Sequence, residues 1–332
     1  MTRPFEGVKI LDFTQMLAGP YASYQLALLG ADVIKVERRE GEDMRRTPLS
    51  REWADRGLAP GWQAINGNKR SLTLDLQKGE AITIVKQLAA SADVILSCLT
   101  NDDAVRQVFT SPEGVFAHAP VGTIILEMST ILPETSRELA RQGASLGLHV
   151  LDVAISGSTP AAEQGTLTLL AGGNQSIFQT VEPIFRSIAT RYFHLGPSGS
   201  GTTMKLVVNT LLGVGMQAIA EACAFGQKAG LDRNLLLEVL GQTAVIAPAH
   251  VGKLVRAAHN DYSPQFPVQL MHKVLRLILE TATGLDAVMP AAQAAFQINS
   301  AALSSSPGQD FSVVMREMER LAHLNRNYEE VA

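Results

Sequence analysis

Apolar segments of strand length alternate with helical patterns along the first part of this chain, and only helical patterns follow. Residues 8–13 (V-K-I-L-D-F) and 32–37 (D-V-I-K-V-E) are short apolar runs typical of buried parallel strands, and a helical segment that ends at Gly30 separates them. The alternation continues to Gly196. This order predicts a doubly wound, mostly parallel Rossmann-like α/β sheet followed by an all-α domain.

The chain is long enough for two domains with cores of their own. It has 332 residues, of which 46% are apolar and 18% charged. We expect a doubly wound α/β domain over residues 1–197 and an all-α domain over residues 198–332. The long helix that opens the second domain contains Gly213 and Gly215, which weaken a helix but allow another element to approach it closely.

Composition and charge exclude several classes of partner. The net charge is −4 and no long basic stretch occurs, so we expect no nucleic acid. The N-terminus lacks an apolar signal core, and we expect no apolar run of transmembrane length, no membrane and a cytoplasmic location. The two cysteines, Cys98 and Cys223, lie in apolar surroundings without metal-ligand spacing. We interpret them as small core residues in a reducing compartment, with no metal site.

Two groups of polar residues could together bind and convert a small acid. Ser156, Gly157 and Ser158 follow an apolar strand, where a glycine lets the backbone approach a ligand and hydroxyl and N–H groups can hold an anion. Lys205 and Asn209 are one turn apart on one face of the long helix. An ordinary turn and a surface lysine are the alternative interpretations. Together the residues are suited to holding a carboxylate and moving a proton at a nearby hydroxyl.

The spacing of these residues matches two motifs of a known family. The pattern D-x-x-x-S-G-x-x-x-x-A-x-x-G-T-L is matched by Asp152, Ser156, Gly157, Ala162, Gly165, Thr166 and Leu167. The pattern G-x-G-x-x-x-K-x-x-x-N is matched by Gly199, Gly201, Lys205 and Asn209. From about residue 92 to about residue 321 the chain therefore resembles the β-hydroxyacid dehydrogenases, whose best-known members are the 3-hydroxyisobutyrate dehydrogenases.

This resemblance implies an NAD- or NADP-dependent oxidoreductase that acts on a small 3-hydroxy acid and forms a homodimer or a higher homo-oligomer. By the same resemblance, Lys205 is the general acid/base, Asn209 positions it, and the substrate carboxylate binds at Ser156, Gly157 and Ser158. The implied contacts to the cofactor include Leu99, Thr130 and Lys273. The chain departs from the family pattern at Glu127 and Val274, where aspartates are usual, and at Thr100 and Asn101, where Pro-Asp is usual.

The first strand–helix loop lacks the dinucleotide fingerprint. A G-x-G-x-x-G loop lets the backbone approach the diphosphate, whereas this loop (T-Q-M-L-A-G-P) contains only Gly19. We expect any adenosine moiety to lie over the ends of the first two strands, near Gly19, Glu37 and Arg38. Glu37 suits the ribose hydroxyls of NAD, and Arg38 suits the ribose phosphate of NADP or CoA, so the choice stays open.

The first 96 residues resemble a different family. The segments R-P-F-E-G-V-K-I-L-D-F-T, A-G-P and N-K-R-S-L-T-L-D-L, between Pro4 and about Leu96, are similar to the start of class III CoA-transferases. That resemblance implies contacts to CoA by residues 15–17 and Arg38. The transferase's aspartate nucleophile and its second lobe have no counterpart here, so transfer activity is not expected. The alternatives to a dehydrogenase are a CoA or acyl-CoA binding protein and a non-catalytic fusion.

Overall fold

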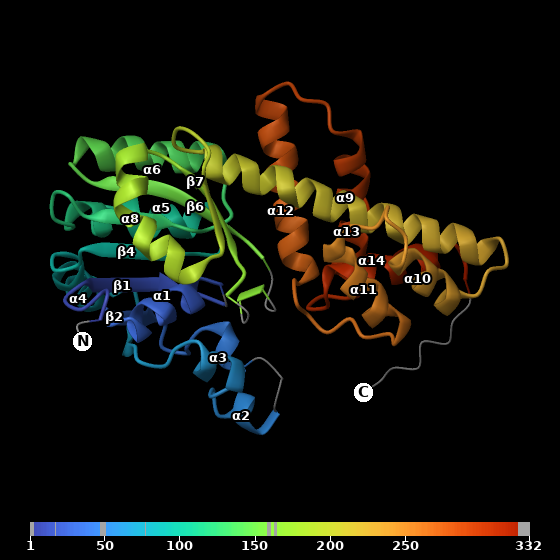
Figure 1. Ribbon diagram of the computed structural model, residues 1–332, viewed down its shortest axis with the longest axis horizontal. Helices are drawn as coiled ribbons and strands as arrows, with labels where there is room; N and C mark the ends of the chain where they lie inside the picture. Colours follow the sequence, from blue (N-terminus) through green and yellow to red (C-terminus); the bar gives the residue numbers. More distant parts are fainter. Residues whose placement is uncertain are drawn as a thin grey trace. The chain divides into compact units, whose positions relative to one another are not determined.

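The computed structural model describes residues 3–16, 18–46, 51–76, 78–157, 161–162 and 165–324. The chain divides into two compact units, Met1–Lys205 and Leu206–Ala332. This division falls inside the helix α9 (Ser200–Lys228), whereas the boundary expected from the sequence precedes that helix. The first unit holds a sheet covered by helices, and the second is built from helices (Figure 1).

The described part of the first unit forms an eight-stranded sheet in the order β3-β2-β1-β4-β5-β6-β7-β8. All neighbouring strands are parallel except β6 and β7. This confirms the predicted mostly parallel Rossmann-like sheet. The strands are β1 (Lys9–Thr14), β2 (Asp32–Glu37), β3 (Arg70–Thr73), β4 (Val94–Cys98), β5 (Ile124–Glu127), β6 (His149–Ser156), β7 (Thr168–Gly172) and β8 (Arg191–His194).

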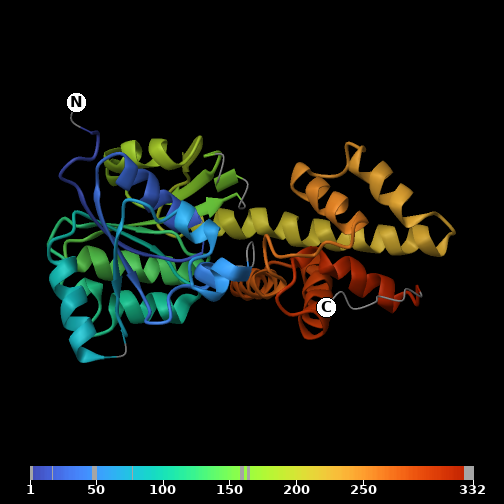
Figure 2. The same cartoon turned by 90° about the horizontal axis from the view of Figure 1, so that it is seen from below.

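Helices cover both faces of this sheet. Figures 1 and 2 show α1 (Ala18–Leu28) and α8 (Gln175–Ile188) over one face, and α4 (Gly79–Ala89), α5 (Asp102–Thr110) and α6 (Pro133–Ser145) over the other. Each layer has its own apolar core. The unit also contains the short segments η1 (Asp43–Arg46), α2 (Arg51–Asp55), α3 (Pro60–Ala64) and η2 (Val115–Ala117).

The strand order creates a switch point between β1 and β4. The chain winds from β1 through β2 to β3 on one side, and from β4 through β5 to β6 on the other. Thr14 and Cys98 are register partners at the carboxyl ends of β1 and β4. Open α/β sheets bind their ligands outside this edge, beside such a switch point. The fold therefore directs attention to the loops that follow β1, β2, β4, β5 and β6.

The second unit is helical throughout its described part. The only strand-like pairing recorded among its described residues is an isolated bridge between Pro267 and Asp310, which agrees with the predicted all-α domain. Its core includes a buried ion pair between Arg233 and Glu319. After α9 come α10 (Arg233–Gly241), α11 (Pro248–Ala258), α12 (Val268–Gly284), α13 (Pro290–Ser305), η3 (Phe311–Val313) and α14 (Val314–Leu321).

Two glycines let other helices approach α9 closely. A Cβ atom at Gly213 would lie 3.0 Å from Met271 Sδ in α12, and one at Gly215 would lie 2.7 Å from His250 Cε1 in α11. By length and composition alone, α9 is apolar enough to cross a membrane. The sequence expectation that no apolar run approaches that length was therefore wrong, because the leucines, valines and alanines of this helix keep its mean hydropathy high. Core helices of water-soluble proteins meet the same criterion.

Candidate functional site

The start of α9 is anchored to the sheet by one buried carboxylate. Asp152 in β6 accepts hydrogen bonds from the backbone N–H groups of Gly199 (2.8 Å) and Thr202 (2.9 Å) and from the Thr202 hydroxyl (3.1 Å). A Cβ atom at Gly201 would lie 2.7 Å from the Asp152 carbonyl oxygen, so only glycine allows this approach. Burial raises the pKa of Asp152 despite these hydrogen bonds. The anchoring residues all belong to the two recognised motifs or their immediate neighbours.

Lys205 lies less than one turn beyond this anchor. Its side chain is half-buried, and burial lowers the pKa of the ammonium to about 8, while the neighbouring Cys98 acts in the opposite direction. Asn209, four residues further along the same helix, is buried, and its Nδ2 donates no hydrogen bond to the described residues. The sequence predicted this pair on one helix face, but it gave no indication that Cys98 lies beside Lys205.

The predicted carboxylate-binding residues lie at the end of β6. Ser156 is the last residue of that strand and pairs with Thr168 of β7. Gly157 has φ +138°, and a Cβ atom there would lie 2.7 Å from a methyl group of Leu167. Glycine is therefore required at this turn. Ser158, the third predicted residue, lies outside the described residues.

The ends of β4 and β5 bring two predicted cofactor residues close together. The backbone N–H of Leu99 donates to Ser129 Oγ at 2.7 Å, and Ser129 directly precedes Thr130. Ser129 in turn donates from its backbone N–H (3.0 Å) and its hydroxyl to Glu127. Glu127 is buried, and burial raises its pKa to about 7. Lys273 lies on α12 in the second unit, and its contact with the cofactor stays a prediction.

The predicted adenosine-binding residues are already engaged within the chain. Glu37 accepts four hydrogen bonds: two from Arg45 (both 2.7 Å), one from Ser71 and one from the backbone N–H of Glu42. These fill the accepting positions of a carboxylate. Arg38 is more exposed; it donates to the Gly41 carbonyl oxygen at 2.7 Å and pairs with Asp43. Gly19 packs on the strands, because a Cβ atom there would lie 2.5 Å from Thr14 Cβ.

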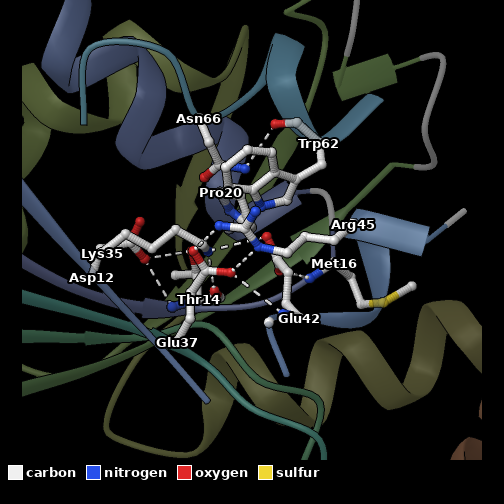
Figure 3. Close-up of polar contacts among 12 residues, drawn as sticks. Asp12, Thr14, Met16, Pro20, Lys35, Glu37, Glu42, Arg45, Trp62 and Asn66 are labelled. Carbon is white, nitrogen blue, oxygen red and sulfur yellow. Dashed lines mark hydrogen bonds and ion pairs between the residues drawn. The ribbon is translucent and has the colours of Figure 1, made fainter. Parts of the chain in front are cut away.

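A network of buried charges lies beside these residues and was not predicted from the sequence (Figure 3). Lys35 Nζ donates to the Thr14 carbonyl oxygen (2.8 Å) and lies 3.3 Å from Glu42 Oε1. Lys69 Nζ lies 3.3 Å from Asp12 Oδ2 and donates to the Pro20 carbonyl oxygen at 2.7 Å. The available signal was a lysine inside the apolar run V-I-K-V-E, because a buried charge requires partners.

The described sites have distinct chemical capacities. The ends of β4, β5 and β6 offer hydroxyl groups and a glycine turn that can approach an anion. The helix α9 supplies Lys205, whose side chain is a mixture of neutral amine and ammonium near pH 8. The end of β1 offers buried cations that are balanced by the chain's own carboxylates.

Comparison with known proteins places the chain in a family. Residues 52–196 match the NAD binding domain of 6-phosphogluconate dehydrogenase, and residues 199–318 match the NAD-binding domain of NADP-dependent 3-hydroxyisobutyrate dehydrogenase. The chain is 30% identical over 273 residues to the 2-(hydroxymethyl)glutarate dehydrogenase of Eubacterium barkeri, covering 78% of this chain and 91% of the relative. It is 31% identical over 272 residues to the 3-hydroxyisobutyrate dehydrogenase of Pseudomonas aeruginosa, covering 76% and 91% respectively.

A solved structure supports the same conclusion. The Mycobacterium tuberculosis 3-hydroxyisobutyrate dehydrogenase, solved with L-serine, superposes with a TM-score of 0.73 at 25% identity, over 93% of this chain and 98% of that one. The nicotinamide dinucleotides NAD and NADP are the cofactors that the two matched domains bind. This chain belongs to the β-hydroxyacid dehydrogenase family, of the 3-hydroxyisobutyrate dehydrogenase type.

Proposed function

We propose that this chain oxidises the hydroxyl group of a small 3-hydroxy acid in an NAD(P)-dependent reaction, with Lys205 as the general acid/base. The observation that carries the proposal is the lysine itself. It is half-buried just after an anchored helix start, and its lowered pKa lets it exist as both amine and ammonium near neutral pH. The names of the relatives, which are dehydrogenases of small hydroxy acids, support the same chemistry.

Each polar group has one task in this proposal. The turn at Ser156 and Gly157 holds the substrate carboxylate through a hydroxyl and backbone N–H groups. As the amine, Lys205 Nζ takes the proton of the substrate hydroxyl; as the ammonium, it returns that proton to the carbonyl oxygen in the reverse direction. The buried Nδ2 of Asn209 supplies a hydrogen-bond donor that positions the substrate oxygen next to the lysine. The nicotinamide ring supplies the hydride acceptor.

The residues fit the two halves of the dinucleotide differently. At the ends of β4 and β5, the hydrogen bond from Leu99 N–H to Ser129 Oγ supports a cofactor contact by Leu99 and by Thr130, the residue after Ser129. At the end of β1, the loop N–H of Met16 and the Glu37 carboxylate are occupied by Glu42 and Arg45 of the same chain. The groups that would contact the adenosine half therefore already have partners within the chain.

A turnover screen tests the proposed function. Wild type and Lys205→Ala are assayed with NAD and NADP against serine, 3-hydroxyisobutyrate and 3-hydroxypropionate, and in reverse with tartronate semialdehyde. We expect wild-type turnover with at least one acid, and a loss in kcat of about a hundred- to ten-thousand-fold for Lys205→Ala. Equal rates for the two proteins would rule out the catalytic lysine. Absence of wild-type turnover with every substrate would favour a non-catalytic fusion.

A second candidate function is the binding of CoA or acyl-CoA by the first unit. The supporting observation is that the matched NAD binding domain begins at residue 52, so that the unit β1–α1–β2 lies outside it. This is the segment that resembles class III CoA-transferases, and Arg38 lies after β2 with its side chain half-exposed. Thermal-shift titration with NAD, NADP, CoA and acetyl-CoA compares the candidates, because a ligand of the folded state raises Tm.

We also propose that the chain acts as a homodimer through its second unit. Val207, Leu211 and Phe225 on α9 expose 51%, 72% and 77% of their surfaces. Large apolar side chains gathered on one helix are typical of an interface between subunits.

A further inference from the structure

The loop after β1 donates to a carboxylate of its own chain. The backbone N–H of Met16 lies 2.9 Å from Glu42 Oε2, and Glu42 Oε1 lies 3.3 Å from Lys35 Nζ (Figure 3). The Lys35 and Glu42 side chains are only 1% and 3% exposed. Met16 has φ +67°, a left-handed conformation that is uncommon outside glycine and frequent where backbone N–H groups surround an anion.

The Glu42 carboxylate occupies a position where related folds bind a phosphate group of their ligand. It accepts a hydrogen bond from Met16, in the loop between the carboxyl end of β1 and α1, and open α/β folds bind the diphosphate of a nucleotide at this loop. The buried charges around it also balance only when it is present. Three cations, Lys35, Lys69 and Arg45, are matched by three carboxylates, Asp12, Glu37 and Glu42. Withdrawal of Glu42 leaves one excess positive charge next to a free N–H donor.

We propose that Met16 N–H and Lys35 form the diphosphate subsite of this chain, and that Glu42 competes for it from within. A nucleotide diphosphate binds there when the Glu42 carboxylate leaves Lys35 and Met16. NAD, NADP and CoA all contain a diphosphate, and titration with each of the three distinguishes between them. The inference deepens the cofactor site of the proposed function, but it concerns binding alone and does not depend on Lys205.

Displacement of Glu42 is linked to proton uptake. Burial raises the pKa of Glu42 above its usual value, and Lys35 opposes this effect. The other charged groups around it are Glu37 from β2, Arg45 from η1, Asp12 from β1 and Lys69 from the segment before β3. In this proposal the displaced Glu42 side chain stays within the buried network beside the bound phosphate. There it has lost the charge of Lys35 and faces an anion, so the pKa of Glu42 rises further and the carboxyl group binds a proton. Affinity for the diphosphate should therefore rise as pH falls below neutral. Lys69, with a pKa lowered to about 8, stays protonated there.

Calorimetric titration of the full chain tests this inference with a matched pair of variants. Glu42→Gln removes the competing charge and keeps the shape, whereas Glu40→Gln removes an exposed charge two residues away. We expect Glu42→Gln to bind NAD about tenfold more tightly than wild type at neutral pH, the effect of removing one unfavourable charge contact. Glu40→Gln should match wild type. Adding Lys35→Met to Glu42→Gln should abolish the gain.

The pH dependence gives an independent readout. NAD is the suitable probe between about pH 5.5 and pH 7, because it lacks the phosphate monoester of NADP and CoA, whose pKa is about 6. Wild-type affinity for NAD should weaken as pH rises through this window, and Glu42→Gln should flatten the dependence. If Glu42→Gln fails to fold, Glu42→Asp serves instead, because its shorter side chain cannot reach both partners.

Unchanged or weaker NAD, NADP and CoA affinity in the folded Glu42 variant would overturn the inference, as would no binding by either protein. A gain for CoA alone would assign the subsite to CoA and would remove NAD from it. If the gain is seen without any turnover, the proposed function fails and the inference stands. If turnover is seen but Glu42→Gln brings no gain in affinity, the inference fails and the proposed function stands.

Discussion

The carboxylate of Asp152 in β6 accepts a hydrogen bond from the backbone N–H of Thr202 in the first turn of α9. It also accepts one from Gly199, so two N–H groups that a helix start leaves without an intrahelical partner are satisfied by the sheet. Lys205 follows three residues after Thr202. The strand therefore sets the position from which the proposed catalytic lysine extends.

Asp152→Asn should both destabilise the protein and slow the reaction. An amide oxygen can replace one carboxylate oxygen, but the amide nitrogen then faces an N–H donor. We expect a loss of about 1–3 kcal/mol in the free energy of unfolding, together with a fall in kcat that exceeds the change in KM. Denaturant unfolding and steady-state kinetics measure the two effects. Asp103→Asn, at an exposed carboxylate, is the control, and equal behaviour of the two variants would refute the anchoring role.

The rate should follow the protonation of Lys205. Because its pKa is about 8, oxidation should accelerate as pH rises towards that value, where the amine form accumulates. Reduction should slow above it, since the ammonium form is then lost. Initial rates in both directions from pH 6 to pH 10 provide the measurement. Two profiles that rise and fall together would contradict an acid/base role.

Lys205→Arg should not restore activity, because arginine remains protonated and cannot accept the hydroxyl proton. Lys205→Met should retain the fold and raise Tm at pH 7, since it removes a charge that burial disfavours. Circular dichroism and thermal melts separate these effects from misfolding. An active arginine variant would show that the residue acts only through its charge.

Glu127 should make stability depend on pH near neutrality. Its pKa is raised from 4.5 to about 7, so the folded state holds the proton more tightly than the unfolded state does. The stabilisation is fully present below about pH 4.5 and is lost as pH rises through about 7. At 1.36 kcal/mol per pH unit, wild type should lose about 3 kcal/mol relative to Glu127→Gln over that range. Urea unfolding at pH 5 and pH 8 measures this, and parallel curves would contradict it.

Leu211→Lys should weaken the proposed dimer. Leu211 is 72% exposed on α9, so a lysine there costs the monomer little and places a charge in an apolar interface. Sedimentation at micromolar concentration should show a dimer for wild type and more monomer for the variant. Lys228→Ala, at the end of the same helix, is a control for changes in charge. A monomeric wild type would end the proposal.

The sequence predicted the fold because its signals are local. Apolar runs such as V-I-L-S-C in β4 and the periodic apolar residues of α8 each specify one element, and their order specifies the winding. The short helices α2 and α3 were not anticipated. Each has five residues, too few to show a helical period, and tertiary contacts decide their conformation.

In the candidate site, too, contacts between residues close in the sequence were predictable, and contacts between distant residues were not. Lys205 and Asn209 are four residues apart, so a helical pattern alone places them together. The bond from Met16 to Glu42 and the pairing of Lys69 with Asp12 join residues 26 and 57 positions apart. No local pattern encodes such contacts. Glu37 is an example: its position at the end of β2 suggested a contact with a ribose, but in the structure its carboxylate pairs with Arg45.

The division of the chain inside α9 has a practical consequence for dissecting the protein. Lys205 is the last residue of the first unit, while Asn209 already belongs to the second. A fragment that ends with the first unit would carry its lysine on the frayed last turn of a short helix, and one that begins with the second unit would lack the lysine. Expressing the units separately therefore separates Lys205, the proposed proton-transfer group, from Asn209. If two such fragments were mixed, any loss of activity would reflect the broken helix α9 more than a weak affinity between the domains.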